Sequence, residues 1–420
     1  MRCKNCLRTK LKKIVFLGKQ PISSIFYNSK RHNIRKYPLD LYICKICKLV
    51  QLGQVAPLNK MYGTNYGYQS GISNLMVKHL QNKFEFLKKK GFLKKKINIL
   101  DIGSNDGTFL NFFSKKNLIT GVDPSIGKFK HNYKANIKKI DNFFSKKIID
   151  KYFKRKKKFD LITSFAIFYD VEKPNSFCKD IESLLSDKGI WILEFSYLPL
   201  MLKNLTYDQI CHEHVTYYSL TVFKRIAEQN ALKILKIKFN EINGGSIEVI
   251  CAKKESNFKI DKKLILRTLE DEKKINKNSY LRFNKRILKI KNDLNLFFKK
   301  NKNKKIIGYG ASTKGNIVLN QCEVSNKNLP FICDANKFKH NKYTPGTNIK
   351  IISKEKMRKL QPDFLLVLIW PFRKEVINQE IEYIKKGGCL IFLLPRFHVV
   401  NKKNYTKFYK QSFKSLSYNY

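Results

Sequence analysis

Ile97-Asn98-Ile99-Leu100-Asp101-Ile102-Gly103-Ser104-Asn105-Asp106-Gly107-Thr108 is the stretch that decides the fold of this chain. Its first six residues carry the apolar pattern of a buried strand, and an apolar helical pattern follows Thr108. Gly103 and Gly107 let the backbone turn tightly and approach a ligand. A strand, a tight turn and a helix in this order form the ligand-binding corner of a doubly wound α/β sheet.

Further strands extend this unit and indicate its ligand. Residues 118–122, 159–166 and 189–194 have strand patterns separated by helical ones, which predicts a Rossmann-like domain. The first of them ends at Asp123, where such folds hold ribose hydroxyls, so a nicotinamide dinucleotide and S-adenosylmethionine both fit. The turn is not GxGxxG, and Asn105-Asp106 brings a carboxylate close to where a pyrophosphate would lie, which favours a cationic sulfonium. We therefore predict an S-adenosylmethionine site formed by Asp101, Gly103, Asn105, Asp106, Gly107, Asp123 and Ser164.

Two CxxC pairs near the N-terminus predict a metal site. Cys3, Cys6, Cys44 and Cys47 can place four thiolates around one Zn²⁺, and the segment between the pairs holds Pro21, Pro38 and short β-prone pieces typical of a small zinc ribbon. Four sulfur ligands leave no open position on the ion. The predicted zinc is therefore structural.

Composition limits the classes of partner. The chain has 420 residues and a formal net charge of +53, but its lysines are spread through every segment, so we expect no dedicated nucleic-acid surface. An anionic substrate such as a nucleotide diphosphate would benefit from this charge. No apolar run is long enough for a transmembrane segment and no signal peptide is evident, so we expect a cytoplasmic protein.

The segment 210–219 concentrates acid–base groups, with His212, Glu213 and His214 beside a thiol and two phenols. A neutral histidine next to a carboxylate can take a proton from carbon or oxygen. A polar loop whose imidazoles satisfy buried carbonyls is the alternative. An HExxH zinc site is disfavoured, because Thr216 stands where its second histidine is required.

The C-terminal half predicts a second α/β unit. Asn243-Gly244-Gly245-Ser246 lies between two strands and is either a hairpin turn or a source of backbone amides for a sugar or its phosphates. Residues 253–303 predict one or two amphipathic helices, with apolar positions that include Leu264, Leu281 and Ile287. The stretch 305–316 is again strand, glycine turn and helix, with Ser312 and Lys314 where an anion can bind, and Asp334 ends the next strand.

This ordered set of motifs resembles the three-domain S-adenosylmethionine-dependent sugar C-methyltransferases. The resemblance rests on the two CxxC pairs, 101–107, His212-Glu213-His214, Asn243-Gly244-Gly245-Ser246 and 308–315, and it spans nearly the whole chain. It implies a nucleotide-linked keto-deoxysugar as substrate, with the His-Glu-His segment at the reacting carbon. Some family members carry Tyr where Cys211 stands, and some carry His near Tyr169-Asp170.

The resemblance and the side-chain chemistry together give each residue a role. A carbon beside a ketone loses its proton when a base is placed on it and the enolate oxygen is stabilised. His214 is the candidate base, Glu213 its partner, and Tyr66, Tyr68 and His212 are candidates to contact the keto oxygen. Candidate substrate-binding residues are Asn243, Gly244, Gly245, Tyr309, Ser312, Lys314 and Asp334, with Lys314 and Ser312 near phosphate and Tyr309 or Trp370 stacking on base or sugar.

The expected organisation is a zinc-binding domain (1–60), a methyltransferase domain (61–255), a helical linker (256–303), a nucleotide-sugar-binding α/β domain (304–400) and a poorly ordered basic tail (401–420). Alternative functions are O- or N-methylation and RNA binding or modification. The sequence does not define the oligomeric state.

Overall fold

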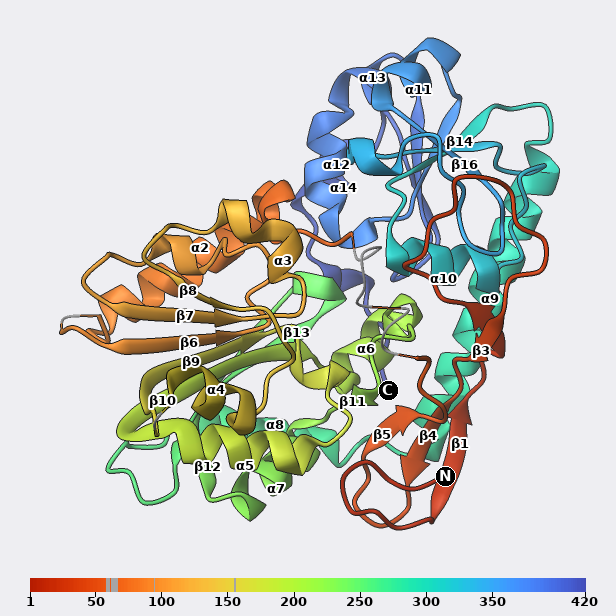
Figure 1. The fold of residues 1–420 in the computed structure, drawn as a ribbon. Coiled ribbons are helices and arrows are strands. Elements are labelled where there is room, and N and C mark those ends of the chain that lie inside the picture. The colour runs from red at the N-terminus through yellow and green to blue at the C-terminus, as the bar shows by residue number, and fades with distance from the viewer. Residues whose placement is uncertain (58–60, 62–66, 94, 155) are drawn as a thin grey trace.

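The computed structural model of the protein describes every residue except 58–60, 62–66, 94 and 155. Three bodies meet near the middle of the molecule (Figure 1): an N-terminal module in red, a central α/β domain in orange to green, and a C-terminal α/β domain in blue. The predicted combination of a zinc ribbon and two Rossmann-like domains is confirmed. Within the described residues, no helix is both long enough and apolar enough to cross a bilayer.

The central domain is built on a seven-stranded sheet of order β12-β13-β10-β9-β6-β7-β8. Strand β13 is antiparallel to its neighbours β10 and β12, and the other pairs are parallel. The strands are β6 (Asn98–Ile102), β7 (Leu118–Val122), β8 (Lys138–Ile140), β9 (Phe159–Phe165), β10 (Leu185–Ser196), β12 (Leu232–Asn240) and β13 (Ser246–Lys253).

Helices cover both faces of this sheet. Because side chains alternate along a strand, Ile99 and Leu100 of β6 belong to two different cores. Helix α2 packs on the first face, and α5 and α7 pack on the second around Trp191. The helices are α2 (Asn74–Lys89), α3 (Ile126–Phe129), α4 (Lys146–Phe153), α5 (Pro174–Leu184), α7 (Leu220–Gln229) and α8 (Lys262–Glu272).

The helix predicted directly after Thr108 is wrong. Only one short turn, η2 (Leu110–Phe112), forms there. Phe109, Leu110 and Phe113 are buried, so the apolar pattern reflects packing rather than a regular helix before β7 begins at Leu118.

The C-terminal domain is a six-stranded sheet of order β16-β15-β14-β17-β18-β19, parallel except for the last strand. Its strands are β14 (Ile306–Tyr309), β15 (Phe331–Cys333), β16 (Lys350–Ile352), β17 (Phe364–Val367), β18 (Cys389–Phe392) and β19 (His398–Val400). Its helices are α10 (Thr313–Gln321), α11 (Lys354–Leu360), α12 (Arg373–Gln379), α13 (Ile381–Lys385) and α14 (Tyr405–Lys410).

The N-terminal module shares a sheet with the central domain. The four-stranded sheet has the order β1 (Leu11–Val15), β4 (Leu41–Cys44), β5 (Val50–Leu52) and β11 (Thr216–Tyr217), and a hairpin joins β2 (Lys19–Pro21) to β3 (Lys36–Pro38). Strand β11 comes directly after the His-Glu-His segment. The module therefore holds that segment through backbone hydrogen bonds.

Helices α6 (Leu198–Asn204) and α9 (Lys277–Lys300) lie where the three bodies meet. The two predicted amphipathic helices exist as α8 and α9, and α9 packs on β1. Ile287 is buried as expected, but Leu264 and Leu281 are exposed. Phe283 and Ile290 lie on the same buried face of α9 as Ile287, whereas Leu281 lies on the exposed face.

The expectation of a poorly ordered tail is wrong, because the last residues pack between the two α/β domains. Phe413 is buried against Trp370, and the Arg373 guanidinium donates to the carbonyl of Gln411 at 2.6 Å. The amide of Tyr418 donates to the carbonyl of Lys203 at 2.7 Å. Aromatic rings give this basic segment an apolar contact surface that charge counting misses.

Candidate active site

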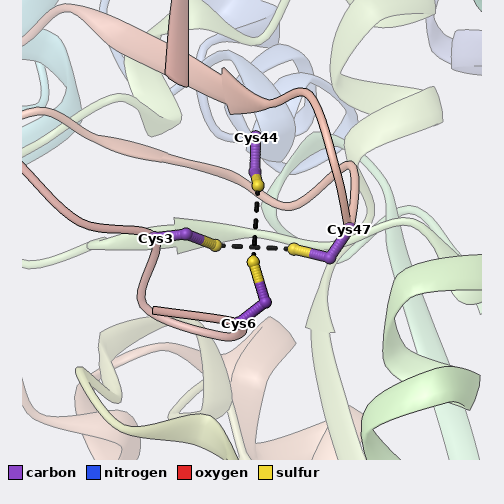
Figure 2. Close-up of side chains that lie close together, drawn as sticks. All are labelled: Cys3, Cys6, Cys44 and Cys47. Carbon is purple, nitrogen blue, oxygen red and sulfur yellow. Dashed lines mark hydrogen bonds between the residues drawn. The ribbon is translucent and has the colours of Figure 1, made fainter. Parts of the chain in front are cut away.

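The four cysteines of the N-terminal module converge on one point (Figure 2). Their sulfur atoms all lie within 4.8 Å of one another, and Cys3 and Cys47 are 3.4 Å apart. A tetrahedron of thiolates at the usual Zn–S bond length has sulfur–sulfur distances of about 3.8 Å, so the arrangement fits Zn²⁺. The described part of the chain offers no further His/Cys/Asp/Glu cluster of this kind.

The glycine turn of the central domain has the backbone conformation that its sequence predicts. Gly103 and Gly107 have φ of +74° and +76°, and a Cβ at Gly103 would lie 2.2 Å from the side chain of Ile167. The segment after the N-terminal module closes over the turn. The amide of Gly71 donates to the Asp106 carboxylate at 2.8 Å, and the Asn105 amide group donates to the carbonyl of Tyr68 at 3.1 Å.

Two carboxylates lie at the carboxyl ends of β6 and β7. Burial raises the pKa of Asp101 to about 7, although Thr163 donates a hydrogen bond to it at 2.6 Å. Burial also raises the pKa of Asp123, whose carboxylate accepts from the Asn105 and Ser125 amides at 3.0 and 2.7 Å. These contacts fix Asp123 at the tip of its strand, where a ribose would be held.

The predicted cofactor contact through the Ser164 side chain is wrong. Ser164 is fully buried, and its hydroxyl accepts a hydrogen bond from the Trp191 indole at 2.9 Å. Alternation along β9 turns Thr163 towards Asp101 and Ser164 into the opposite core.

The His-Glu-His segment is held from both sides. The amide of Leu52 in β5 donates to the carbonyl of Val215 at 3.0 Å, and the amide of Val215 donates to the carbonyl of Tyr169 at 2.9 Å. The His214 ring lies against the Tyr169 ring with a centroid separation of 4.1 Å. These contacts fix the orientation of the imidazole.

The His214 imidazole is held in a single orientation. Its Nδ1 donates to the carbonyl of Gln209 at 2.8 Å, which leaves the lone pair on Nε2. Burial and the nearby Lys314 ammonium lower the pKa of His214 to about 3. The imidazole is therefore neutral at physiological pH.

The other predicted catalytic residues have different surroundings. His212 is buried, and its Nε2 lies 3.4 Å from the carbonyl of Tyr37 in the N-terminal module. Glu213 is buried with one carboxylate oxygen that accepts no hydrogen bond among the described residues. Tyr68 is half exposed, and Tyr66 lies outside the described residues.

The Asn-Gly-Gly turn packs at the joint between the two α/β domains. Asn243 and Gly244 have φ of +57° and +80°, and a Cβ at Gly244 would lie 2.6 Å from Trp370. The Lys314 ammonium donates to the Asn243 side-chain oxygen at 2.7 Å. The turn is thus a β-hairpin connection, and its outer surface contacts the C-terminal domain.

The aromatic stacking predicted for the C-terminal domain is wrong. Tyr309 is only 2% exposed, and its hydroxyl donates to Gln379 at 3.0 Å and accepts from Lys354 at 2.6 Å. Trp370 is also buried, and its indole donates to Asp208 at 2.8 Å. Both rings fill the space between elements, so neither face is free for a base or sugar.

Ser312 and Asp334 lie at the glycine turn of this domain. The Ser312 hydroxyl accepts from the amide of Gly315 at 2.9 Å and caps α10. Asp334 follows β15, accepts from the amide of Asn336 at 2.8 Å and lies 3.8 Å from the Lys339 ammonium.

Sequence reasoning missed Gln209 and Asp208, which precede the His-Glu-His segment in η5 (Tyr207–Gln209). Gln209 is fully buried, and its side-chain amide donates to the carbonyl of Asn243 at 2.8 Å while its own carbonyl accepts from His214. In the sequence, only the position of Asp208 and Gln209 shortly before the His-Glu-His segment could have indicated that they contribute to the site.

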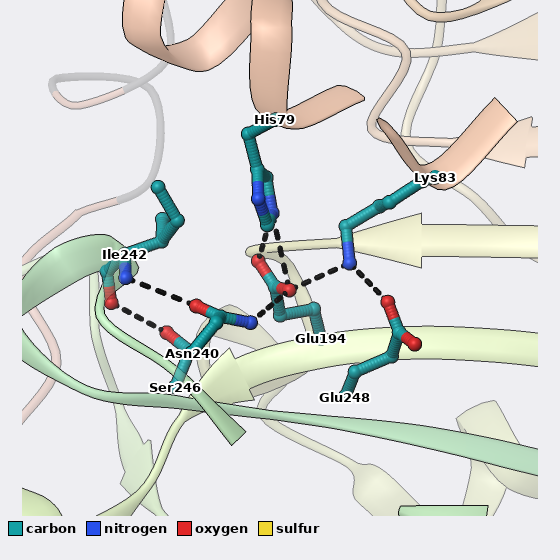
Figure 3. A network of polar contacts seen from close by, with 7 residues as sticks. All are labelled: His79, Lys83, Glu194, Asn240, Ile242, Ser246 and Glu248. Carbon is teal, nitrogen blue, oxygen red and sulfur yellow. Dashed lines mark hydrogen bonds and ion pairs between the residues drawn. The ribbon is translucent and has the colours of Figure 1, made fainter. Parts of the chain in front are cut away.

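A buried ionic network ties α2 to the sheet (Figure 3). The Lys83 ammonium donates to Glu194 at 2.7 Å and also contacts Glu248. The carboxylate of Glu194 also lies 3.0 Å from the His79 imidazole and accepts from the Asn240 amide group at 2.7 Å. Burial alone would raise the pKa of Glu194, but Lys83 and His79 outweigh it and lower that pKa to about 2.

The central sheet defines the class of protein. Seven strands with one antiparallel strand, β13, inserted between β10 and β12 give the strand order of class I methyltransferases. The turn after β6 and the carboxylate after β7 occupy the cofactor edge of that fold.

Comparisons with known proteins give the family. Residues 3–62 match the "Putative zinc binding domain", residues 76–237 the "Methyltransferase domain", and residues 241–395 the "C-methyltransferase C-terminal domain". The chain is 24% identical over 374 residues to the C-methyltransferase NovU of Streptomyces niveus, covering 88% of this chain and 89% of the relative.

Solved methyltransferase structures match less than half of the chain. Magnesium protoporphyrin IX methyltransferase from Synechocystis PCC 6803, with bound S-adenosylmethionine, is 14% identical and covers 47% of this chain and 89% of its own, with a TM-score of 0.33. The plantazolicin methyltransferase BpumL is 15% identical and covers 44% of this chain and 88% of its own, with a TM-score of 0.35.

The chain therefore belongs to the three-domain C-methyltransferases, which join a zinc-binding domain, a class I methyltransferase domain and a C-methyltransferase C-terminal domain. It is an S-adenosylmethionine-dependent enzyme that methylates carbon. O- and N-methylation are thereby set aside.

Proposed function

We propose that this enzyme methylates the carbon beside the ketone of a nucleotide-linked keto-deoxysugar, with His214 as the base. The observation that carries the proposal is the hydrogen bond from His214 Nδ1 to the carbonyl of Gln209 at 2.8 Å. It fixes the tautomer in which Nε2 has a free lone pair. Abstraction of a carbon-bound proton requires such an oriented, unprotonated base.

The position of the base supports a bulky, anionic substrate. His214 lies in the central domain, and Lys314 reaches that domain from the C-terminal domain through its hydrogen bond to Asn243. The glycine turn of the C-terminal domain (308–315) leads into α10. A net charge of +53 favours approach of a diphosphate. Asp334 and Ser312 at the second glycine turn are the proposed contacts to the nucleotide part.

The residues at the carboxyl ends of β6 and β7 support a binding site for S-adenosylmethionine. Gly103 and Gly107 permit close approach, Asp123 is the proposed partner of the ribose hydroxyls, and Asp106 is the proposed neighbour of the sulfonium. S-adenosylmethionine supplies the electrophilic methyl group. The chain's own task is to generate the carbanion next to it.

Deuterium exchange tests the base directly. The protein is incubated in deuterated water with a panel of nucleotide-linked 4-keto-deoxysugars, first without a methyl donor and then with labelled S-adenosylmethionine. We expect exchange at the carbon beside the ketone, a loss of about 100-fold or more in His214→Ala, and no change in His32→Ala, whose side chain is exposed. Equal exchange rates in wild type and His214→Ala would refute His214 as the base.

A further inference from the structure

Lys314 has an unusual position for a lysine at a glycine turn. It is the second residue of α10, yet its ammonium points to the central domain and donates to Asn243 at 2.7 Å. Among the described residues, Lys314 forms no ion pair with a carboxylate. A largely enclosed ammonium with one neutral partner has donors left for an anion.

Three hydrogen bonds connect this ammonium to the base. Lys314 donates to the side chain of Asn243, Gln209 donates to the carbonyl of Asn243 at 2.8 Å, and His214 donates to the carbonyl of Gln209 at 2.8 Å. Helix α10 packs on η5, which contains Gln209. The ammonium and the imidazole are therefore fixed in one frame, although they come from different domains.

Acidic groups of η4, η5 and the segment 210–219 act on the pKa of Lys314. The ionisable groups that act electrostatically on Lys314 are Asp208 from η5, Asp170 from η4 (Phe168–Asp170), Cys211 directly before the His-Glu-His segment, and Glu213 within it. Lys314 in turn contributes to the lowered pKa of His214. The hydrogen bond to Asn243 directs the ammonium to the central domain, which also carries His214.

We propose that Lys314 is a catalytic residue that binds the ketone oxygen and stabilises the enolate formed when His214 removes the neighbouring proton. This inference rests on the proposed function. In the step, the C–H bond breaks and its proton goes to Nε2 of His214. The electron pair moves into the enolate, whose negative oxygen accepts a hydrogen bond from the Lys314 ammonium. The Lys314 ammonium thus stabilises the negative oxygen. Cys211, which has no phenol group, does not supply a tyrosine hydroxyl for this task.

Kinetic constants distinguish stabilisation of the enolate by Lys314 from binding of a phosphate by Lys314. Stabilisation of charge that develops only during the reaction changes kcat, whereas a contact to a phosphate is made equally before and during the step and changes KM. Loss of the ammonium also removes one of the two causes that lower the pKa of His214. The acid limb of the exchange rate must then move to higher pH.

The experiment compares Lys314→Met, Lys314→Arg and the control Lys304→Met in the full-length, zinc-loaded protein, with the sugars that the wild type exchanges. Lys304 is an exposed lysine of the same domain, paired with Asp363. We expect Lys314→Met to slow exchange by about 100-fold or more with little change in KM, and to move the acid limb upward. Lys314→Arg should recover part of the rate, and Lys304→Met should match the wild type. Thermal unfolding and zinc content establish that each variant is folded.

Three other results would contradict the proposed role of Lys314 or the proposed function. A Lys314→Met variant with an almost unchanged exchange rate and a raised KM would overturn the enolate role and leave the proposed function standing. An unchanged acid limb, with kcat and KM altered together and no recovery in Lys314→Arg, would identify Lys314 as a domain-joining residue only. Absence of exchange and methylation in the wild type with every sugar would overturn the proposed function and this inference together.

Discussion

Replacing Lys83 by Met removes the cation of a buried network and leaves two carboxylates behind. Lys83, Glu194 and Glu248 are each less than 10% exposed, so solvent screens their charges little. A pKa that falls from 4.5 to about 2 corresponds to about 3 kcal/mol of stability at neutral pH. This agrees with the roughly 3–5 kcal/mol lost when one partner of a buried ion pair is removed.

The pH dependence of the loss has a definite sign. The folded state lowers the pKa of Glu194, so its ionised carboxylate contributes fully above pH 4.5, and the contribution is lost as pH falls towards 2. In Lys83→Met, burial acts on Glu194 without its main counter-charge. The difference in unfolding free energy between wild type and variant is therefore largest near neutral pH and shrinks below pH 4.5.

Urea unfolding of the full chain, followed by circular dichroism between pH 2 and 8, measures this difference. Acid also affects the zinc site, but it does so in both proteins, and the comparison removes it. Lys224→Met is the matched control, because its ion pair with Glu228 is exposed and contributes at most about 0.5 kcal/mol. Adding Glu194→Gln and Glu248→Gln to Lys83→Met should restore part of the lost stability. A Lys83→Met variant as stable as Lys224→Met at pH 7 would refute the reasoning.

Three further outcomes follow from the contacts between the bodies. Cys3→Ser should release zinc and speed amide hydrogen exchange across 210–219, because β5 of the zinc-binding module pairs with β11. Cys389→Ser, which lies outside the four-cysteine cluster, should change neither zinc content nor exchange. Mass spectrometry measures both quantities. Deleting residues 411–420 should lower the unfolding free energy by about 2 kcal/mol or more through the loss of buried Phe413, and an unchanged denaturation midpoint would contradict this. Gly244→Ala should lower the unfolding free energy by about 1–3 kcal/mol and reduce methylation, because its φ is +80° and the added Cβ meets Trp370. Gly387→Ala is the control, since Gly387 also has positive φ but has open space around it. Calorimetry of the two variants separates the effect of the contact from that of backbone strain.

Local pattern was sufficient for the fold class and for the metal ligands. The apolar run into Gly103 and Gly107 defines a strand and a turn wherever it is placed, because φ above zero is needed there and glycine adopts it freely. The two CxxC pairs likewise bring thiolates together through backbone bends of a few residues. These features can therefore be predicted without knowing which distant residues they contact.

Side-chain direction and domain contacts could not be read in the same way. Thr163 and Ser164 are adjacent polar residues at a strand end, and only the two different cores decide that one reaches Asp101 and the other Trp191. The aromatic tail residues likewise gain their order from a surface that exists only when both α/β domains are folded.

The sequence by itself determined the class I sheet, the zinc ligands and the presence of acid–base groups at 212–214, because each depends on spacing along the chain. Only the tertiary structure decided which of those groups has a free lone pair and which lysine joins its hydrogen-bond network. His214 owes its tautomer to the carbonyl of Gln209, and Lys314 reaches the same site from another domain. The energies of buried charges depend on distances through space, and those distances are set by packing between bodies far apart in the chain.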